Sequence, residues 1–160
     1  AASPPQFTKV PLRALVDDAG FEARLTDNPH VGFDNEVPED FQITADSSQI
    51  GRLLVNLLKN AREALDNGSG AGHGGKVSVR AEAGPTEAVI SVIDNGPGLP
   101  KRARENLFVA FEGSVRSGGT GLGLAIAREI AEAHGGRLEL AETEKGTRFD
   151  IVLPLSPTGA

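Results

Sequence analysis

Residues 46–65 read DSSQIGRLLVNLLKNAREAL and carry the strongest helix signal in the sequence. Asp46 is a favourable N-cap residue, and Gln49 follows three positions later, as in a capping box. Apolar residues then recur at the i, i+3, i+4 and i+7 spacing that places them on one helix face. They are Ile50, Leu53, Leu54, Leu57, Leu58, Ala61, Ala64 and Leu65. The stretch therefore predicts a long helix whose broad apolar face covers a core.

Shorter segments on both sides of this helix alternate apolar and polar residues, as half-buried strands do. The predicted strands cover residues 30–37, 41–45, 76–83, 87–94, 137–141 and 147–153. A weak pattern at residues 12–24 indicates a helix or a helix-to-strand join, and a clear helical pattern at residues 121–134 stops at Gly135-Gly136. Together these segments predict an α/β sandwich, in which a mixed, mostly antiparallel sheet has helices on one face.

The length of 160 residues is that of one domain. The Pro-rich residues 1–10 predict a linker or tail, residues 11–155 the domain, and residues 156–160 a second tail. No apolar run approaches the ~20 residues needed to cross a bilayer. The sequence contains no Met, which we interpret as excision of one module from a longer protein whose membrane attachment stays open.

The composition argues against several classes of function. Asp and Glu number 22 against 16 Lys and Arg, and this acidic balance disfavours binding to nucleic acid or to an anionic membrane. Without Cys the chain has no disulfide, thiolate zinc site or cysteine nucleophile, and it fits a reducing compartment such as the cytoplasm. His30, His73 and His134 are far apart in the sequence, which disfavours a histidine metal site. His134 ends a predicted helix, where a protonated side chain is favourable.

Asn56 and Asn60 lie four residues apart in the long predicted helix, at the polar edge of its apolar face. They could be two solvent-facing amides. A carboxamide oxygen is also a hard ligand suited to Mg²⁺, which takes few protein ligands beside phosphates and water. The pair alone leaves both interpretations open.

The run Asp94-Asn-Gly-Pro-Gly98 ends a predicted strand. Asn-Gly is a common hairpin signal, so a tight turn is one interpretation. In the other, Asp94 accepts a hydrogen bond from an exocyclic amine at the end of the sheet, while Gly96 and Gly98 let a flat ligand approach the backbone.

The run Gly118-Gly-Thr-Gly-Leu-Gly123 opens the second clear helix. A Gly-rich turn at a helix N-terminus exposes N–H groups and favours an anion such as phosphate. The run is neither a Walker A loop, since no Gly-Lys-Ser/Thr follows, nor a dinucleotide fingerprint, since no strand leads into it.

These three sites occur in a fixed order that resembles the catalytic, ATP-binding domain of sensor histidine kinases, a member of the GHKL superfamily with the Bergerat fold. Asn56-Leu-Leu-Lys-Asn60-Ala resembles the N box, in the variant typical of nitrogen-regulation kinases, and Asp94-Asn-Gly-Pro-Gly98 resembles the G1 box. Phe108-Val-Ala-Phe111 resembles the F box, and Gly119-Thr-Gly-Leu-Gly-Leu124 the G2 box. The resemblance extends from about residue 12 to residue 155.

The resemblance implies a role for each polar residue. Asn60 would coordinate Mg²⁺ on the ATP phosphates, with Asn56 supporting it. Asp94 would accept the adenine amino group, and Gly96, Gly98 and Thr147 would shape the adenine pocket.

The same resemblance implies an ATP lid over residues 99–118. Phe108 and Phe111 would anchor the lid, and Arg116 would contact the γ-phosphate, although a lone loop arginine is often merely solvated. The residues of the phosphate loop would be Gly119, Thr120, Gly121, Leu122 and Gly123.

Two departures from the family pattern bear on the chemistry. Glu63-Ala64 stands where many members have a Lys-aromatic pair, so a phosphate contact and an aromatic adenine wall are in doubt. Related ATPases place a glutamate general base where this chain has Asn56. An amide cannot take a proton at neutral pH, so we expect slow hydrolysis and transfer of the γ-phosphate to an acceptor.

No histidine here lies in a helix with an adjacent carboxylate and a following proline, as the phosphorylated histidine of the family does. The resemblance therefore implies transfer to a histidine on a separate dimerisation domain and then to a response regulator, with the isolated domain a monomer. Two alternatives stay open: an anti-sigma-factor-like serine kinase, and a non-catalytic regulatory module that binds ATP.

Overall fold

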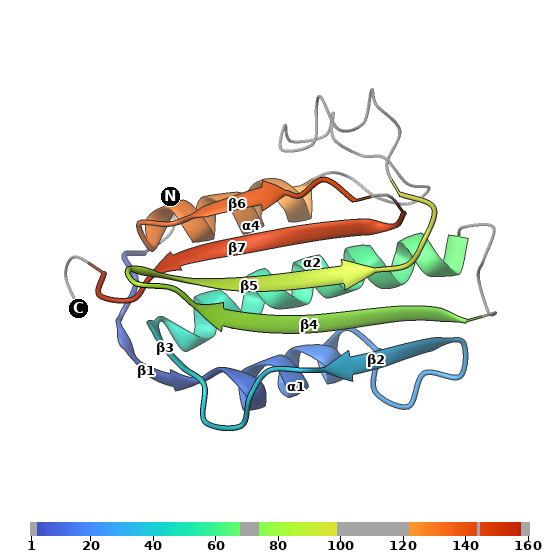
Figure 1. Ribbon diagram of the computed structural model, residues 1–160, viewed down its shortest axis with the longest axis horizontal. Helices are drawn as coiled ribbons and strands as arrows, with labels where there is room; N and C mark the ends of the chain where they lie inside the picture. The colour runs from blue at the N-terminus through green and yellow to red at the C-terminus, as the bar shows by residue number, and fades with distance from the viewer. Residues whose placement is uncertain (1–2, 68–73, 99–121, 144, 158–160) are drawn as a thin grey trace.

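The computed structural model describes residues 3–67, 74–98, 122–143 and 145–157. They form a two-layer α/β sandwich with a five-stranded sheet in one layer and helices in the other (Figure 1). The described helices are α1 (Leu12–Glu22), α2 (Ser47–Asn67) and α4 (Leu122–Ala133). The described strands are β1 (Thr8–Pro11), β2 (Val31–Asn35), β3 (Gln42–Ala45), β4 (Gly75–Ala83), β5 (Glu87–Asp94), β6 (Arg137–Leu140) and β7 (Thr147–Pro154).

The strands of the large sheet lie in the order β2-β4-β5-β7-β6. Strand β2 is parallel to β4, whereas the β4–β5, β5–β7 and β6–β7 pairs are antiparallel. A second, two-stranded sheet joins β1 to β3. The predicted mixed, mostly antiparallel sheet with helices on one face is thus confirmed.

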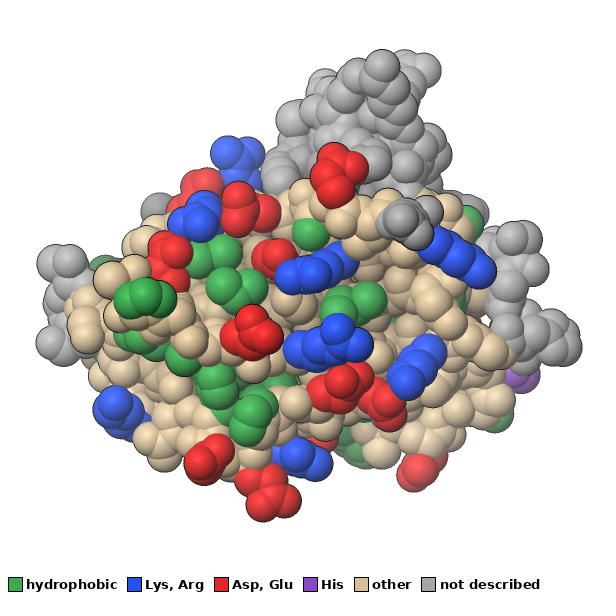
Figure 2. Space-filling view, viewed as in Figure 1, with side chains coloured by type: hydrophobic (Ala, Val, Ile, Leu, Met, Phe, Trp, Pro, Cys, Tyr) green, Lys and Arg blue, Asp and Glu red, His purple; other side chains and the backbone are tan. Residues whose placement is uncertain are grey.

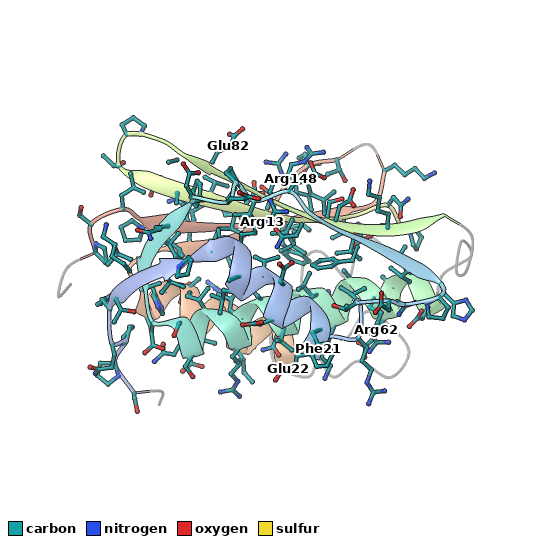
Figure 3. All side chains as sticks on the ribbon, turned by 90° about the horizontal axis from the view of Figure 1, so that it is seen from below. Arg13, Phe21, Glu22, Arg62, Glu82 and Arg148 are labelled. Atoms are coloured by element: carbon teal, nitrogen blue, oxygen red, sulfur yellow. The ribbon has the colours of Figure 1, made fainter. Side chains whose placement is uncertain are left out.

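Helix α2 supplies the largest part of the core between the layers. The eight residues of its predicted apolar face are all 4% exposed or less. The segment at residues 12–24 resolves as helix α1, without a join to a strand. Figure 3 shows the layers edge-on, with Phe21 and Glu22 of α1 on the helix side and Glu82 and Arg148 on the sheet side.

The face of the sheet that the described helices leave uncovered carries pairs of opposite charges (Figure 2). Neighbouring strands join Lys76 to Asp34 at 2.6 Å and Arg80 to Glu36 at 3.3 Å. Arg137 of β6 reaches across β7 to Glu87 of β5 at 3.1 Å. Exposed pairs of this kind contribute little stability each, about 0–1 kcal/mol. Their position explains the alternating pattern of the strands, since every second residue faces water.

The prediction of a tail over residues 1–10 is wrong for residues 8–10. These residues begin β1, which pairs antiparallel with β3 from Thr8 opposite Ala45 to Pro11 opposite Gln42. Val10 is 4% exposed. The prolines of this segment suggested a linker, whereas pairing with a strand more than thirty residues away decides its structure.

Asp46 caps α2 as predicted, but the capping box is only half formed. The Gln49 backbone N–H donates to Asp46 Oδ1 at 3.1 Å. The Gln49 side chain does not return to the Asp46 backbone; it donates to Ser3 O at 2.9 Å. The Asp46 N–H instead donates to His134 Nε2 at 3.1 Å. The expected helix-end cation at His134 is therefore wrong, because a nitrogen that accepts this hydrogen bond carries no proton.

Asp46 should make the stability of the domain depend on pH. Burial raises the pKa of Asp46, but N–H groups of Gln6, Gln49 and Ser48 outweigh burial and hold that pKa below its usual value. A lowered carboxyl pKa stabilises the fold above the ordinary value of about 3.9, and this stabilisation is lost as the pH falls. Urea unfolding should show that Asp46→Asn has a lower free energy of unfolding than wild type at pH 7. The difference between the two free energies should shrink as the pH falls. The exposed Asp40→Asn is the control, and a difference independent of pH would contradict the assignment.

Among the described residues, none of the helices combines the length and the apolar character that a bilayer crossing requires.

Candidate functional site

Asp94 and Thr147 face each other at one end of the large sheet. Asp94 is the last residue of β5, Thr147 is the first of β7, and the two are directly paired. Both are buried, at 5% and 3% exposure. The Gly96 N–H donates to Asp94 Oδ1 at 3.0 Å, which orients the carboxylate. Thr147 Oγ1 is buried and has no hydrogen-bond partner among the described residues. A buried hydroxyl without a partner is costly, so this atom points to a missing ligand or water.

The turn after Asp94 is not the hairpin that Asn-Gly could have formed. Asp94 pairs with Thr147 on one side and with Val77 on the other, and both are distant in the sequence. Asn95 fastens this turn to the start of β4: its Nδ2 donates to Gly74 O at 2.8 Å, and its Oδ1 accepts the Lys76 N–H at 2.7 Å. Sequence reasoning missed this role. The available signal was an Asn at a strand end, a residue that often bonds to nearby backbone.

Two glycine backbones meet beside Asp94. Gly98 and Gly146 have φ values of +82° and +80°, which L side chains rarely adopt. A Cβ on Gly98 would lie 3.1 Å from Gly146 O, and a Cβ on Gly146 would overlap Asp94 O. The conformation of Gly98, a glycine predicted to shape the adenine pocket, therefore depends on Gly146, which lies just before the predicted strand at residues 147–153.

Leu65 of α2 lies beside Gly96. A Cβ on Gly96 would lie 3.2 Å from Leu65 Cδ2 and 3.0 Å from Asp94 Oδ1. Gly96 is thus held between the carboxylate and an apolar side chain. Ala64, at the position of the missing aromatic residue, is buried at 3% exposure. Leu65 thus places an aliphatic side chain next to Gly96, at the end of the sheet where Asp94 lies.

Asn56 and Asn60 lie half-buried on α2. Asn56 Nδ2 donates to Gly123 O at 3.3 Å, in the first turn of α4. The interpretation of Asn56 as a solvent-facing amide is therefore wrong. This hydrogen bond joins the predicted N box to the predicted phosphate loop.

Part of the predicted site lies outside the described residues, namely Phe108, Phe111, Arg116, Gly119, Thr120 and Gly121, with the rest of the lid segment 99–118. Leu122 is the first residue of α4, and Gly123 follows it. Helix α4 has no acidic residue in its first turn, so its N-terminal N–H groups keep the positive potential that favours an anion. Within the described ranges no cluster of three His, Cys, Asp or Glu could hold a metal ion.

This geometry has clear counterparts among known proteins. The family described as "Histidine kinase-, DNA gyrase B-, and HSP90-like ATPase" matches residues 45–157. The nitrogen regulation protein NtrY of Azorhizobium caulinodans is 39% identical over 82% of this chain. The sensory histidine kinase/phosphatase NtrB of Klebsiella oxytoca is 34% identical over 77% of it. The expected likeness to nitrogen-regulation kinases is thus confirmed. The chain spans 17% of NtrY and 36% of NtrB.

The solved catalytic domain of the histidine kinase ThkA shares the fold. It is 31% identical, with a TM-score of 0.77, and the match covers 95% of this chain and 97% of that domain. Sequence, fold and the order of the boxes agree. The chain belongs to the family of histidine kinase-, DNA gyrase B- and HSP90-like ATPases, and within it to the catalytic domains of sensor histidine kinases.

Proposed function

We propose that this domain binds Mg²⁺-ATP at the shared end of α2, β5, β7 and α4 and donates the γ-phosphate to a histidine on another domain. The observation that carries this proposal is the buried pair Asp94 and Thr147. A carboxylate beside a partnerless hydroxyl suits the edge of adenine, which offers an amino donor next to a ring-nitrogen acceptor. Leu65 provides an apolar surface beside this pair.

The phosphates would lie between Asn60 and the start of α4. The donor set fits Mg²⁺, because a carboxamide oxygen is a hard ligand and this ion takes few protein ligands when phosphates supply the rest. Asn60 would hold the ion, which would neutralise the charge on the phosphates. Asn56 would hold the first turn of α4 in place through its hydrogen bond to Gly123 O. Arg116 and the lid aromatic residues keep their proposed roles at the γ-phosphate and over the nucleotide.

Asn56 also argues for a kinase over a hydrolase. Its amide nitrogen donates to Gly123 O, and an amide does not accept a proton at neutral pH, so this side chain cannot activate water. Transfer would rest on positioning and on charge neutralisation, with the proton of the reaction handled by the acceptor.

The acceptor histidine would lie on another domain of a longer protein, and the later partner would be a separate protein. His134 is buried at 2% exposure with both ring nitrogens engaged, so it is not the acceptor. ThkA has been solved in complex with the response regulator protein TrrA. We place a histidine-bearing dimerisation domain and a response regulator as successive acceptors here, with this domain itself a monomer. Because the reaction consumes ATP, we place it in the cytoplasm.

Phosphotransfer tests this function directly. The chain is incubated with Mg²⁺ and γ-labelled ATP, together with the histidine-bearing region of its own longer protein. We expect label on that region that is lost in acid, as a phosphorylated histidine requires. Acid-stable label on a serine would favour the anti-sigma-factor-like alternative. ATP binding without transfer would favour the regulatory module.

Thr147→Val should change stability and nucleotide affinity in opposite directions. Removing a buried hydroxyl that lacks a partner should raise the free energy of unfolding by about 1 kcal/mol. The same change removes the proposed contact to the base and should weaken binding of a non-hydrolysable ATP analogue. Urea unfolding and calorimetry measure the two effects. Thr44→Val, in β3 away from the site, should leave affinity unchanged, and a Thr147→Val protein with wild-type affinity would contradict the role of the hydroxyl.

A further inference from the structure

Residues 3–7 are fastened to the start of α2, far from the candidate site. The Gln6 N–H donates to Asp46 Oδ2 at 2.8 Å, and the Gln49 side chain donates to Ser3 O at 2.9 Å. The two carboxylate oxygens of Asp46 have different partners. Oδ1 caps α2 by accepting the Gln49 N–H, and Oδ2 accepts the Gln6 N–H of the N-terminal segment. One buried side chain therefore serves both the helix and the segment.

His134, at the end of α4, is hydrogen-bonded to Asp46 at the start of α2. Its Nε2 accepts the Asp46 N–H at 3.1 Å, and its Nδ1 lies 2.9 Å from Ile130 O. With Nε2 as the acceptor, Nδ1 is the ring nitrogen that donates to Ile130 O. Phe7 of the N-terminal segment meets the ring edge-on, with ring centroids 5.5 Å apart. Figure 1 shows the start of α2, the end of α4 and the segment that leads into β1 at one end of the sandwich.

A second hydrogen bond joins the same two helices near the candidate site. Asn56 lies ten residues after Asp46, and Gly123 lies eleven residues before His134. At 1.5 Å per residue these spacings correspond to about 15 and 16 Å along the two helices. Helices α2 and α4 are thus joined by two hydrogen bonds, Asp46 to His134 and Asn56 to Gly123, which are separated by similar lengths on both helices. Their relative position sets where Asn56 meets the first turn of α4.

We propose that residues 3–7 are coupled to nucleotide binding through Asp46 and His134, which act as positioning residues of the kinase. Contact of the segment with Asp46 and His134 holds α2 and α4 in the register that binds the phosphates. The inference rests on the proposed nucleotide site. Coupling of binding free energies is reciprocal, so bound nucleotide strengthens the contacts of residues 3–7.

A matched pair of substitutions at Gln6 tests the coupling without altering Asp46 or α2. Gln6→Pro removes the backbone N–H that Asp46 Oδ2 accepts, whereas Gln6→Ala keeps it and changes only an exposed side chain. Calorimetry with Mg²⁺ and a non-hydrolysable ATP analogue should show affinity lowered about 2- to 10-fold for Gln6→Pro, the equivalent of one hydrogen bond. Gln6→Ala should bind as wild type does.

Hydrogen exchange supplies the reciprocal readout, which a purely structural role would not move. In wild type and in Gln6→Ala, the analogue should slow exchange of the Gln6 amide, although this amide is distant from the site. Equal affinity of Gln6→Pro and Gln6→Ala would overturn the coupling, as would exchange at Gln6 that the analogue leaves unchanged. If wild type and Gln6→Ala both fail to bind, the proposed function is overturned and the inference with it.

His134 is tested by restoring its acceptor. In His134→Gln a carboxamide oxygen can take the place of Nε2 and accept the Asp46 N–H, whereas His134→Leu fills similar space without an acceptor. We expect His134→Gln to bind the analogue more tightly than His134→Leu at a temperature where both are folded. Equal affinities would remove His134 from the coupling. If His134→Leu does not fold, the Gln6 pair decides.

Discussion

Asp94→Asn should weaken binding of an ATP analogue by about 10- to 100-fold, the effect of losing a hydrogen bond to a charged acceptor in a buried site. The direction follows from the geometry at Gly96. Its N–H donates to Asp94 Oδ1, so an asparagine would keep its oxygen there and turn its NH₂ group toward the adenine amine. Two donors would then face each other. Isothermal titration calorimetry with Mg²⁺ measures the loss.

The same argument predicts a change in base preference. Guanine presents a carbonyl oxygen where adenine presents its amine, so the NH₂ group of Asp94→Asn would suit guanine better. The ratio of ATP to GTP analogue affinities should therefore fall in the variant. Asp34→Asn, an exposed carboxylate paired with Lys76, is the control and should bind as wild type does. Unchanged ATP affinity in a folded Asp94→Asn protein would contradict the adenine assignment.

Gly146→Ala should destabilise the domain by about 3 kcal/mol or more, among the largest effects that a single added methyl group can have. Two causes combine. The backbone at φ +80° disfavours a side chain by roughly 1 kcal/mol, and the new Cβ would overlap Asp94 O. Relief requires the ends of β5 and β7 to move apart, where Asp94 and Thr147 are paired.

Urea unfolding measures this loss, and Gly32→Ala is a suitable control. Gly32 lies in β2, and the nearest atom to an added Cβ there is 3.8 Å away, in ordinary contact. We expect its stability to stay within about 1 kcal/mol of wild type. If Gly146→Ala is as stable as Gly32→Ala, the prediction is contradicted. The backbone at Asp94 would then move aside for the new Cβ at little cost in free energy.

Helix α2 was predictable because its signal is local. Apolar residues recur at helical spacing within the segment itself and mark the face that packs on the core. Asp94 was a candidate because it ends a predicted strand, but Thr147 was found only through the resemblance. The two are 53 positions apart, and only the register of β5 and β7 brings them together. The contacts of Asn95, Gly146 and His134 were not predictable. Each depends on backbone atoms of a distant segment, and neither propensity nor periodicity reports which distant segment that is. The pairing of β1 with β3 was missed for the same reason.

The attachment of residues 3–7 at one end of the sandwich has a mechanical consequence. Helix α2, with 21 residues, is about 30 Å long and runs from this attachment toward Asn60 and the candidate site. If the sandwich turned about this attachment, the candidate site would lie at the far end of an arm about 30 Å long. A swing of about 20° about the attachment would carry that far end roughly 10 Å along an arc. A small change of angle at the N-terminal segment would thus be a large displacement at the candidate site.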